Sequence, residues 1–254
     1  DLKIFQWEDE IAVSMAMLGA NFAGSRAMCA TSGWWFALMT ESIWFANQTE
    51  IWWVYILSQR DGPSTGTPTF TSQSDLDFAL NSSFWETRPI VLMPSSLEEW
   101  YSILGKALNY AKIYQHPIIV MLDKQFSESY VSLVEKDLKY TEIDMGLLEK
   151  NPKEFARYQY TKSGISPYTI PGTPEGEFMA SSYEHDEFGA TNEDPLIKWK
   201  MTEKRAKKID TFIENEYTKD NFWFEVINPD AETMFISFGV NTYVLQDYIA
   251  NNKD

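Results

Sequence analysis

The chain is poor in cysteine. Among 254 residues there is one, Cys29, so an internal disulfide is excluded. A single thiolate is also too few for an iron–sulfur cluster, which usually takes four. The lack of disulfides favours a cytoplasmic setting. Cys29 lies in an apolar stretch and is predicted to be a small core residue.

Basic residues are also scarce. Lys and Arg number 21 against 37 Asp and Glu, a net charge of −16. This balance argues against a nucleic-acid surface and favours electropositive partners or none. No apolar run is long enough to span a bilayer, and no signal peptide opens the chain, so no membrane partner is expected. The first residue is Asp1 rather than methionine, and we expect the chain to begin inside a longer polypeptide.

The first half of the chain alternates two apolar patterns. Four continuous apolar runs have the length of buried strands: 26–31, 51–57, 89–94 and 117–123. Four segments have helical spacing: 10–23, 35–47, 73–80 and 96–116. Asp9 and Ser96 are expected N-caps, with Glu99 at a capping-box position. The alternation predicts an α/β domain over 1–123, with a parallel sheet covered by helices on both faces.

The composition of the sequence changes after this domain. Residues 124–220 are polar and interrupted by Pro and Gly, which predicts a long connecting arm lying on a surface. Its one expected helix is 201–216. A strand at 233–239 and a helical pattern to about 250 predict the start of a second α/β domain over 221–254.

The segment 59–76, QRDGPSTGTPTFTSQSDL, carries the strongest functional signal. It follows an apolar run, so Arg60 stands at the carboxyl end of a predicted strand, where open α/β sheets bind ligands. An arginine beside several short hydroxyls suits a small carboxylate or phosphate, because its planar fork can bond two oxygens at once. The alternative is a solvated connection whose arginine pairs with a neighbouring acid.

Several motifs occur in an order that points to a known family. They are QWEDEIAVSMAMLGANFAGSRAMCATSG, LMTE, QTEI, the loop QRDGPSTGTPTFTSQSDL, and the later GISPYTIPGT, EHDEFG and KR. Together, from residue 6 to about 240, they resemble the α subunit of 2-oxoacid:ferredoxin oxidoreductases. The resemblance implies a thiamine diphosphate enzyme and a pyrimidine-binding domain. It further implies oxidative decarboxylation of a 2-oxoacid to its acyl-CoA, with electrons passed to ferredoxin.

The resemblance assigns cofactor roles to three residues. In thiamine enzymes one carboxylate lies beside N1′ of the cofactor's aminopyrimidine, and the resemblance implies that Glu10 holds this place as the catalytic residue. Thr31 and Ser32 would line the same cofactor pocket. The alternative for Glu10 is that it merely decorates a helix N-terminus, as acids commonly do.

The same resemblance assigns substrate roles within the hydroxyl-rich loop. Arg60 would bind the 2-oxoacid carboxylate, and Thr69 would lie near the same substrate. Ser64 and Thr65 are further substrate-binding candidates. The alternative for each hydroxyl is a turn-stabilising role.

The sequence also departs from the family pattern. The family's TSGPG turn reads TSGWW at Thr31–Trp35, its E-I-P strand start reads EIWW from Glu50, and Asn81–Trp85 replaces a Gly-rich segment. A Trp cannot simply replace Gly where the backbone takes positive φ. The sequence therefore does not decide whether this turn contacts the cofactor. Two alternatives therefore stand: a subunit of another thiamine-dependent enzyme, or a non-catalytic assembly subunit of the same fold.

The metal ion and the iron–sulfur cluster of such an enzyme are expected on another subunit. The chain has no GDG…N pattern of the kind that holds Mg²⁺ and the diphosphate of the cofactor. Mg²⁺ and a [4Fe-4S] cluster are therefore expected on a β partner subunit, not on this chain. Ferredoxin, coenzyme A and the 2-oxoacid complete the expected partners.

The two histidines and a cluster of basic residues are predicted to have structural rather than catalytic roles. His185 is flanked by acids and is expected in a loop that covers the active site or the partner, rather than at a metal. His116 is expected at a helix C-terminus with no chemistry. Four basic residues are predicted to form a solvated helix face, with subunit docking as the alternative: Lys204, Arg205, Lys207 and Lys208.

Overall fold

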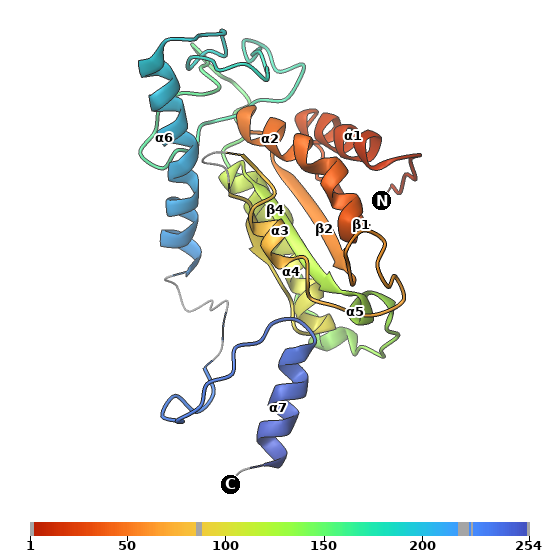
Figure 1. The fold of residues 1–254 in the computed structure, drawn as a ribbon. Helices are drawn as coiled ribbons and strands as arrows, with labels where there is room; N and C mark the ends of the chain where they lie inside the picture. The colour runs from red at the N-terminus through yellow and green to blue at the C-terminus, as the bar shows by residue number, and fades with distance from the viewer. Residues whose placement is uncertain (1–2, 85–87, 218–223, 225, 253–254) are drawn as a thin grey trace.

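A four-stranded parallel sheet forms the centre of the fold (Figure 1). The computed structural model describes residues 3–84, 88–217, 224 and 226–252. The strands are β1 (Met28–Ser32), β2 (Trp53–Gln59), β3 (Ile90–Leu92) and β4 (Pro117–Asp123), in the order β1-β2-β4-β3. They overlap the four predicted apolar runs and confirm the α/β fold class. Trp85 and the boundary expected at residues 220 and 221 lie outside the described residues.

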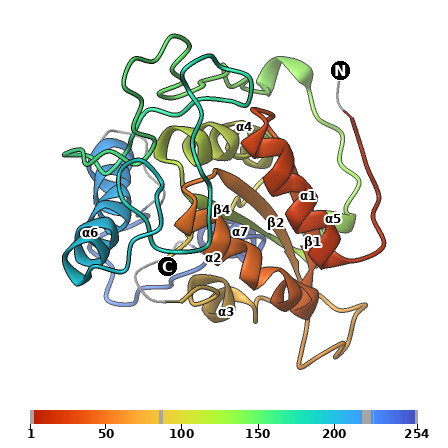
Figure 2. The ribbon, with the colours of Figure 1, turned by 90° about the horizontal axis from the view of Figure 1, so that it is seen from above.

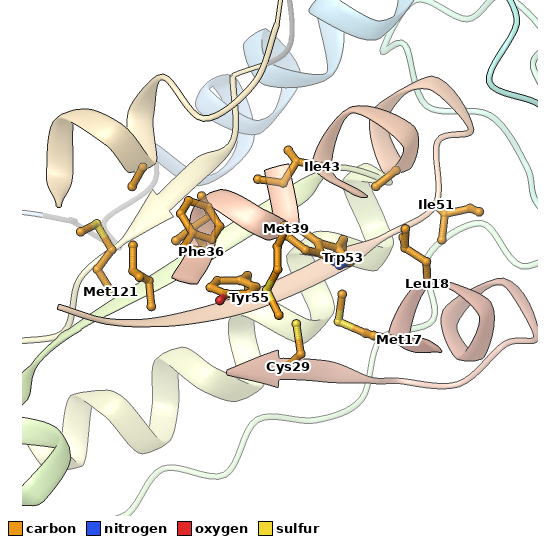
Figure 3. Close-up of a cluster of buried hydrophobic side chains, with 14 residues drawn as sticks. Met17, Leu18, Cys29, Phe36, Met39, Ile43, Ile51, Trp53, Tyr55 and Met121 are labelled. Atoms are coloured by element: carbon orange, nitrogen blue, oxygen red, sulfur yellow. The ribbon is translucent and has the colours of Figure 1, made fainter. Parts of the chain in front are cut away.

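One face of the sheet is covered by short helices. They are α1 (Glu10–Phe22), a 3₁₀ helix η1 (Gly33–Met39), α2 (Thr40–Gln48) and α3 (Leu76–Leu80). Their apolar residues surround Trp53 and Tyr55 of β2 and Met121 of β4 (Figure 3). Cys29 belongs to this cluster, as predicted, and burial raises the pKa of its thiol.

Two helices on this face differ from their predicted form. The segment expected as a helix over 35–47 begins as 3₁₀ turns, because Gly33, at φ 56°, turns the chain sharply out of β1. The helix expected over 73–80 starts only at Leu76. Gln73 and Ser74 form side-chain hydrogen bonds outside that helix, with Phe238, Asn241 and Arg60.

The opposite face is covered by α4 (Leu97–Tyr114), by part of the arm and by α6 (Pro195–Phe212) (Figure 2). Helices thus lie on both faces, as predicted. The hydroxyl of Ser96 accepts from the Glu99 amide at 2.9 Å, which confirms this N-cap. The Glu99 carboxylate accepts from the amide of Ser95 at 2.6 Å, one residue before the expected capping-box partner.

The arm is more structured than predicted. It contains the short helix α5 (Lys124–Glu128) and the 3₁₀ turn η2 (Glu135–Asp137). Its long helix α6 starts six residues before the predicted 201, and a π turn, η3 (Ile213–Tyr217), follows it. The missed start has a local cause, since Asp194 accepts from the Leu196 amide at 2.7 Å and Pro195 takes the first helical position.

The C-terminal part only partly matches its prediction. The helix is present as α7 (Asn241–Asn251), but 233–239 is not a strand. A strand needs a neighbour for its backbone hydrogen bonds, and no described strand pairs with this segment. Its apolar side chains are exposed, at 79% for Met234 and 84% for Ile236. Within the described ranges no helix combines the length and apolar content that a membrane span requires.

Candidate functional site

A cavity of about 720 Å³ lies at the carboxyl ends of β1, β2 and β4. Thr31 and Ser32 come from the end of β1, Ser58 from β2 and Leu122 from β4. Glu10, the first residue of α1, supplies a carboxylate to the wall, and Ser127 and Ser129 add hydroxyls. The cavity therefore occupies the edge of a parallel sheet at which ligands commonly bind.

Glu10 is held at this wall by the start of α1. The carboxylate of Asp9 accepts from the Ala12 amide at 2.7 Å and fixes the first turn, as predicted. Glu10 is half-buried. The structure thus brings three of the candidate residues, Glu10, Thr31 and Ser32, around one cavity. Their roles stay predictions.

Aromatic side chains form much of the remaining wall. Trp35, Trp100 and Phe126 line the cavity. Trp34 stacks on Trp35, with ring centroids 4.2 Å apart and planes 23° from parallel. Such walls suit a flat ring whose edge meets the polar groups.

The tryptophans of the TSGWW turn do not occupy its left-handed position. The positive φ of the turn falls on Gly33, at 56°, and neither Trp34 nor Trp35 takes a positive φ. The left-handed position is thus still occupied by glycine. Trp35, the second of the two tryptophans, lines the cavity.

Arg60 lies beside the same turn. A Cβ on Gly33 would come within 2.9 Å of the Arg60 Nε, so the guanidinium packs directly on this glycine. Its Nε and Nη2 are buried without a hydrogen-bond partner among the described residues. No ion pair joins Arg60 to an acid in that part of the chain, so the structure offers no salt bridge as the reason for its position.

The hydroxyls of the loop lie elsewhere. Ser64, Thr65 and Thr69 are exposed, and none of them lines the cavity. The loop is shaped by Gly66, at φ 50°, where a Cβ would collide with the carbonyl oxygen of Asp61. Arg60 does not line the cavity either, but it packs on Gly33, the residue after Ser32.

A buried ionic cluster, absent from the sequence predictions, attaches the arm to the sheet. Glu50, just before β2, is fully buried, and both of its oxygens lie 2.7 Å from the Lys204 Nζ. The Lys208 Nζ is 2.6 Å from Oε2, and Arg157 donates to the Glu50 carbonyl oxygen at 2.6 Å. Burial opposes ionisation of Glu50, but Lys204, Lys208 and Arg157 outweigh it and lower the pKa of the carboxyl.

The solvated face predicted for the four basic residues of α6 is therefore wrong for three of them. Lys204, Lys208 and Arg205 are buried, and Lys207 alone of the four is partly exposed, at 42% of its side chain. Arg205 donates to the two oxygens of Glu184 at 2.9 and 3.0 Å. No local spacing reveals this, because Glu50 and Lys204 are 154 residues apart in the chain.

Both histidines have structural partners. The His116 ring is buried after α4 with Nε2 2.7 Å from the Arg88 carbonyl oxygen, and burial lowers its pKa to about 4. His185 is buried against the Tyr158 ring, at 4.0 Å between centroids. Residues 3–84, 88–217, 224 and 226–252 hold no group of three His, Cys, Asp or Glu side chains that could bind a metal. The covering role expected for the His185 loop stays a prediction.

Comparison with protein families decides what kind of chain this is. Residues 1–204 match the family described as pyruvate flavodoxin/ferredoxin oxidoreductase, thiamine diphosphate-binding. The chain belongs to this family. The resemblance noted from the motifs is thereby confirmed.

Its relatives in this family are longer proteins. The α subunit of 2-oxoacid:ferredoxin oxidoreductase 2 from Aeropyrum pernix is 37% identical over 241 residues, which are 93% of this chain and 37% of that protein. The 2-oxoglutarate synthase subunit KorA from Methanothermobacter thermautotrophicus is 43% identical over 244 residues, 92% of this chain and 64% of that protein.

A solved structure shares the fold. The 2-oxoglutarate:ferredoxin oxidoreductase from Magnetococcus marinus, with 2-oxoglutarate, coenzyme A and succinyl-CoA bound, superposes with a TM-score of 0.76 at 34% identity. The match covers 83% of this chain and 37% of that one. The family, the fold and the thiamine diphosphate-binding class of the domain are therefore shown.

Proposed function

We propose that this chain supplies the aminopyrimidine side of the thiamine diphosphate site in a 2-oxoacid:ferredoxin oxidoreductase. The reaction converts a 2-oxoacid to its acyl-CoA and passes electrons to ferredoxin. The observation that carries the proposal is Glu10, which shares one cavity with Thr31 and Ser32 at the carboxyl edge of the sheet in a chain of this family.

The residues of the cavity fit the cofactor. A volume of about 720 Å³ lies in the usual range for small-molecule sites. Its walls combine Trp35 and Trp100 with one carboxylate, which suits a flat heterocycle with a polar edge. When bound, thiamine diphosphate supplies the carbanion stabilisation that decarboxylation of a 2-oxoacid requires.

The chain's own side chains contribute binding and proton chemistry. The Glu10 carboxylate would hold the edge of the aminopyrimidine and could exchange a proton with its ring nitrogen. The hydroxyls of Thr31 and Ser32 can donate to or accept from the same ring. Arg60 offers two buried N–H groups, on Nε and Nη2, to the carboxylate of the 2-oxoacid. Ser64, Thr65 and Thr69 would reach this substrate by a movement of their exposed loop.

Other parts of the reaction belong to other molecules. One buried cysteine cannot hold a [4Fe-4S] cluster. We therefore assign the cluster, Mg²⁺ and the diphosphate site to a β partner subunit. Ferredoxin is the electron acceptor and coenzyme A the acyl acceptor. The coenzyme A and succinyl-CoA bound in the Magnetococcus enzyme support this acyl acceptor.

The test uses the full-length protein assembled with its partner subunit and stripped of cofactor. Ferredoxin reduction should require thiamine diphosphate, coenzyme A and a 2-oxoacid, and calorimetry should detect cofactor binding. Glu10→Gln should abolish activity, whereas the matched control Glu8→Gln, outside the cavity, should not. A Glu10→Gln enzyme with full activity would instead support the non-catalytic assembly subunit.

A further inference from the structure

The hydroxyl-rich loop ends in a three-residue strip, Gln73–Asp75, with partners on two sides. On one side the Ser74 hydroxyl donates to the Arg60 carbonyl oxygen at 3.3 Å. Burial raises the pKa of the Asp75 carboxyl, and the neighbouring Arg60 partly offsets this shift. The strip therefore fixes the main chain of the arginine that the proposed function places on the substrate.

On its other side the strip holds the segment before α7. The Gln73 side chain donates to the Phe238 carbonyl oxygen at 2.8 Å. It also accepts from the Asn241 amide group at 2.7 Å. A single glutamine thus bridges the Arg60 loop and a segment 165 residues further along the chain.

The end of β4 holds the same segment from below. Asp123 is 2% exposed, and its Oδ2 accepts from the Val240 amide at 2.7 Å. Gly239 lies at φ 60°, and a Cβ there would collide with the Asp123 carboxylate. Glycine is thus required for the segment to approach this closely. Figure 1 shows α7 leaving from the end of the sheet at which α5 also lies.

We propose that Gln73, Asp123 and Gly239 form a clasp that positions Arg60 for substrate binding. The clasp seats Phe238–Asn241 between β4 and the strip, and the strip then holds the Arg60 backbone. These three are positioning residues, since none of them lines the cavity. The inference rests on the proposed role of Arg60.

The experiment uses the assembled enzyme carrying Gln73→Ala, Gly239→Ala or both. Gln73→Ala removes the Gln73 hydrogen bonds, and Gly239→Ala displaces the segment from Asp123. Loss of a hydrogen bond corresponds to roughly a threefold to tenfold change in affinity, so the KM for the 2-oxoacid should rise by about that factor. The kcat and the KM for coenzyme A should change less than about twofold. The double variant should resemble the more affected single variant, because both changes open one clasp.

Hydrogen exchange gives a second, independent measurement. Exchange of the 61–72 backbone should speed up in both variants, while exchange in α4 stays unchanged and reports that the domain is folded. The matched control is Asn251→Ala, whose amide donates to Asp247 within α7. It should alter neither measurement.

The outcomes separate the two proposals. A wild-type enzyme that uses 2-oxoacids, with an unchanged substrate KM in both clasp variants, overturns the clasp alone. A wild-type enzyme that uses no 2-oxoacid overturns the proposed function. In that case the exchange of 61–72 still decides whether the clasp orders the loop, and unchanged exchange rejects it.

Discussion

Arg60 carries two buried nitrogens, Nε and Nη2, that have no hydrogen-bond partner among the described residues. Both are available to a bound carboxylate. Arg60→Lys keeps the charge but cannot reproduce a two-pronged contact with a carboxylate. Loss of a charge-assisted hydrogen bond is worth about 1.5–3 kcal/mol, so kcat/KM for the 2-oxoacid should fall roughly 10- to 150-fold. The melting temperature should hardly change, because the side chain faces a turn at the sheet edge rather than the core.

Arg26→Lys is the matched control for this prediction. The Arg26 Nη1 donates to Asn109 at 2.7 Å, and Arg26 precedes β1, at the opposite end of the strand from Thr31 and Ser32. This variant should lower the melting temperature with near-normal kinetics. If Arg60→Lys shows that same pattern, its role is structural and the substrate contact is refuted.

The role of the Glu10 carboxylate can be tested by a single substitution. Glu10→Gln preserves the shape of the side chain but removes the proton-exchanging carboxylate. Hydrogen–deuterium exchange at C2 of thiamine diphosphate in the assembled enzyme should slow by about 10²- to 10⁴-fold. Exchange within about threefold of wild type, a barrier change under about 0.7 kcal/mol, would show that another acid does this work.

Single residues were predictable where their signal is local or carried by a motif. The caps at Asp9 and Ser96 act within three residues, and both are present. Arg60 stands where its strand ends, as expected. The exposure of Thr69 depends instead on how a sixteen-residue loop folds back, which short-range spacing does not determine.

At the scale of elements, α6 is joined to the sheet by charge inside the protein. Glu50→Gln would leave Lys204 and Lys208 buried without their counter-charge. Breaking one side of such a cluster should lower the free energy of unfolding by about 3–5 kcal/mol. Chemical denaturation measures this loss, and limited proteolysis should cut the arm near α6 sooner.

Lys207→Met on the same helix serves as the control. Its ammonium is exposed and pairs with Asp210 at 3.5 Å, so the change should stay within about 0.5 kcal/mol. Equal losses in Glu50→Gln and Lys207→Met would mean that the buried cluster has no special weight in holding the arm.

The existence of most elements followed from the sequence, but their surroundings did not. Apolar runs predict β2 and β4 because buried parallel strands are apolar on both faces. The basic pattern of α6 equally fits a solvated face or a buried ionic cluster, and only the distant Glu50 decides between them. The 233–239 run has strand composition, yet strand formation requires a neighbour that the described chain does not supply.

For the whole molecule, the two histidines predict how stability depends on pH. The pKa of His116 is lowered to about 4 from 6.5, chiefly because burial disfavours the charged ring. Between pH 6.5 and 4 the unfolded chain takes up this proton and the folded chain does not. The free energy of unfolding should therefore fall as the pH drops through this window, by up to about 3 kcal/mol.

Equilibrium unfolding at several pH values between 7 and 4 tests this dependence. His116→Gln should flatten the slope, because its side chain does not titrate. His185→Gln should remove a different share, since burial also lowers the pKa of that ring. An unchanged slope in His116→Gln would assign the acid sensitivity to the carboxylates instead.

More basic than acidic side chains are buried in the described part of this molecule. Among the described residues the buried acids are Glu50 and Asp123. The buried basic residues in the same ranges are more numerous: Lys112, Arg157, Lys204, Arg205 and Lys208. The charged side chains that reach the surface are therefore more acidic in balance than the net charge of −16 suggests. A dense counterion layer follows, and encounters with basic surfaces should be fast in dilute buffer and slow down steeply as salt is added.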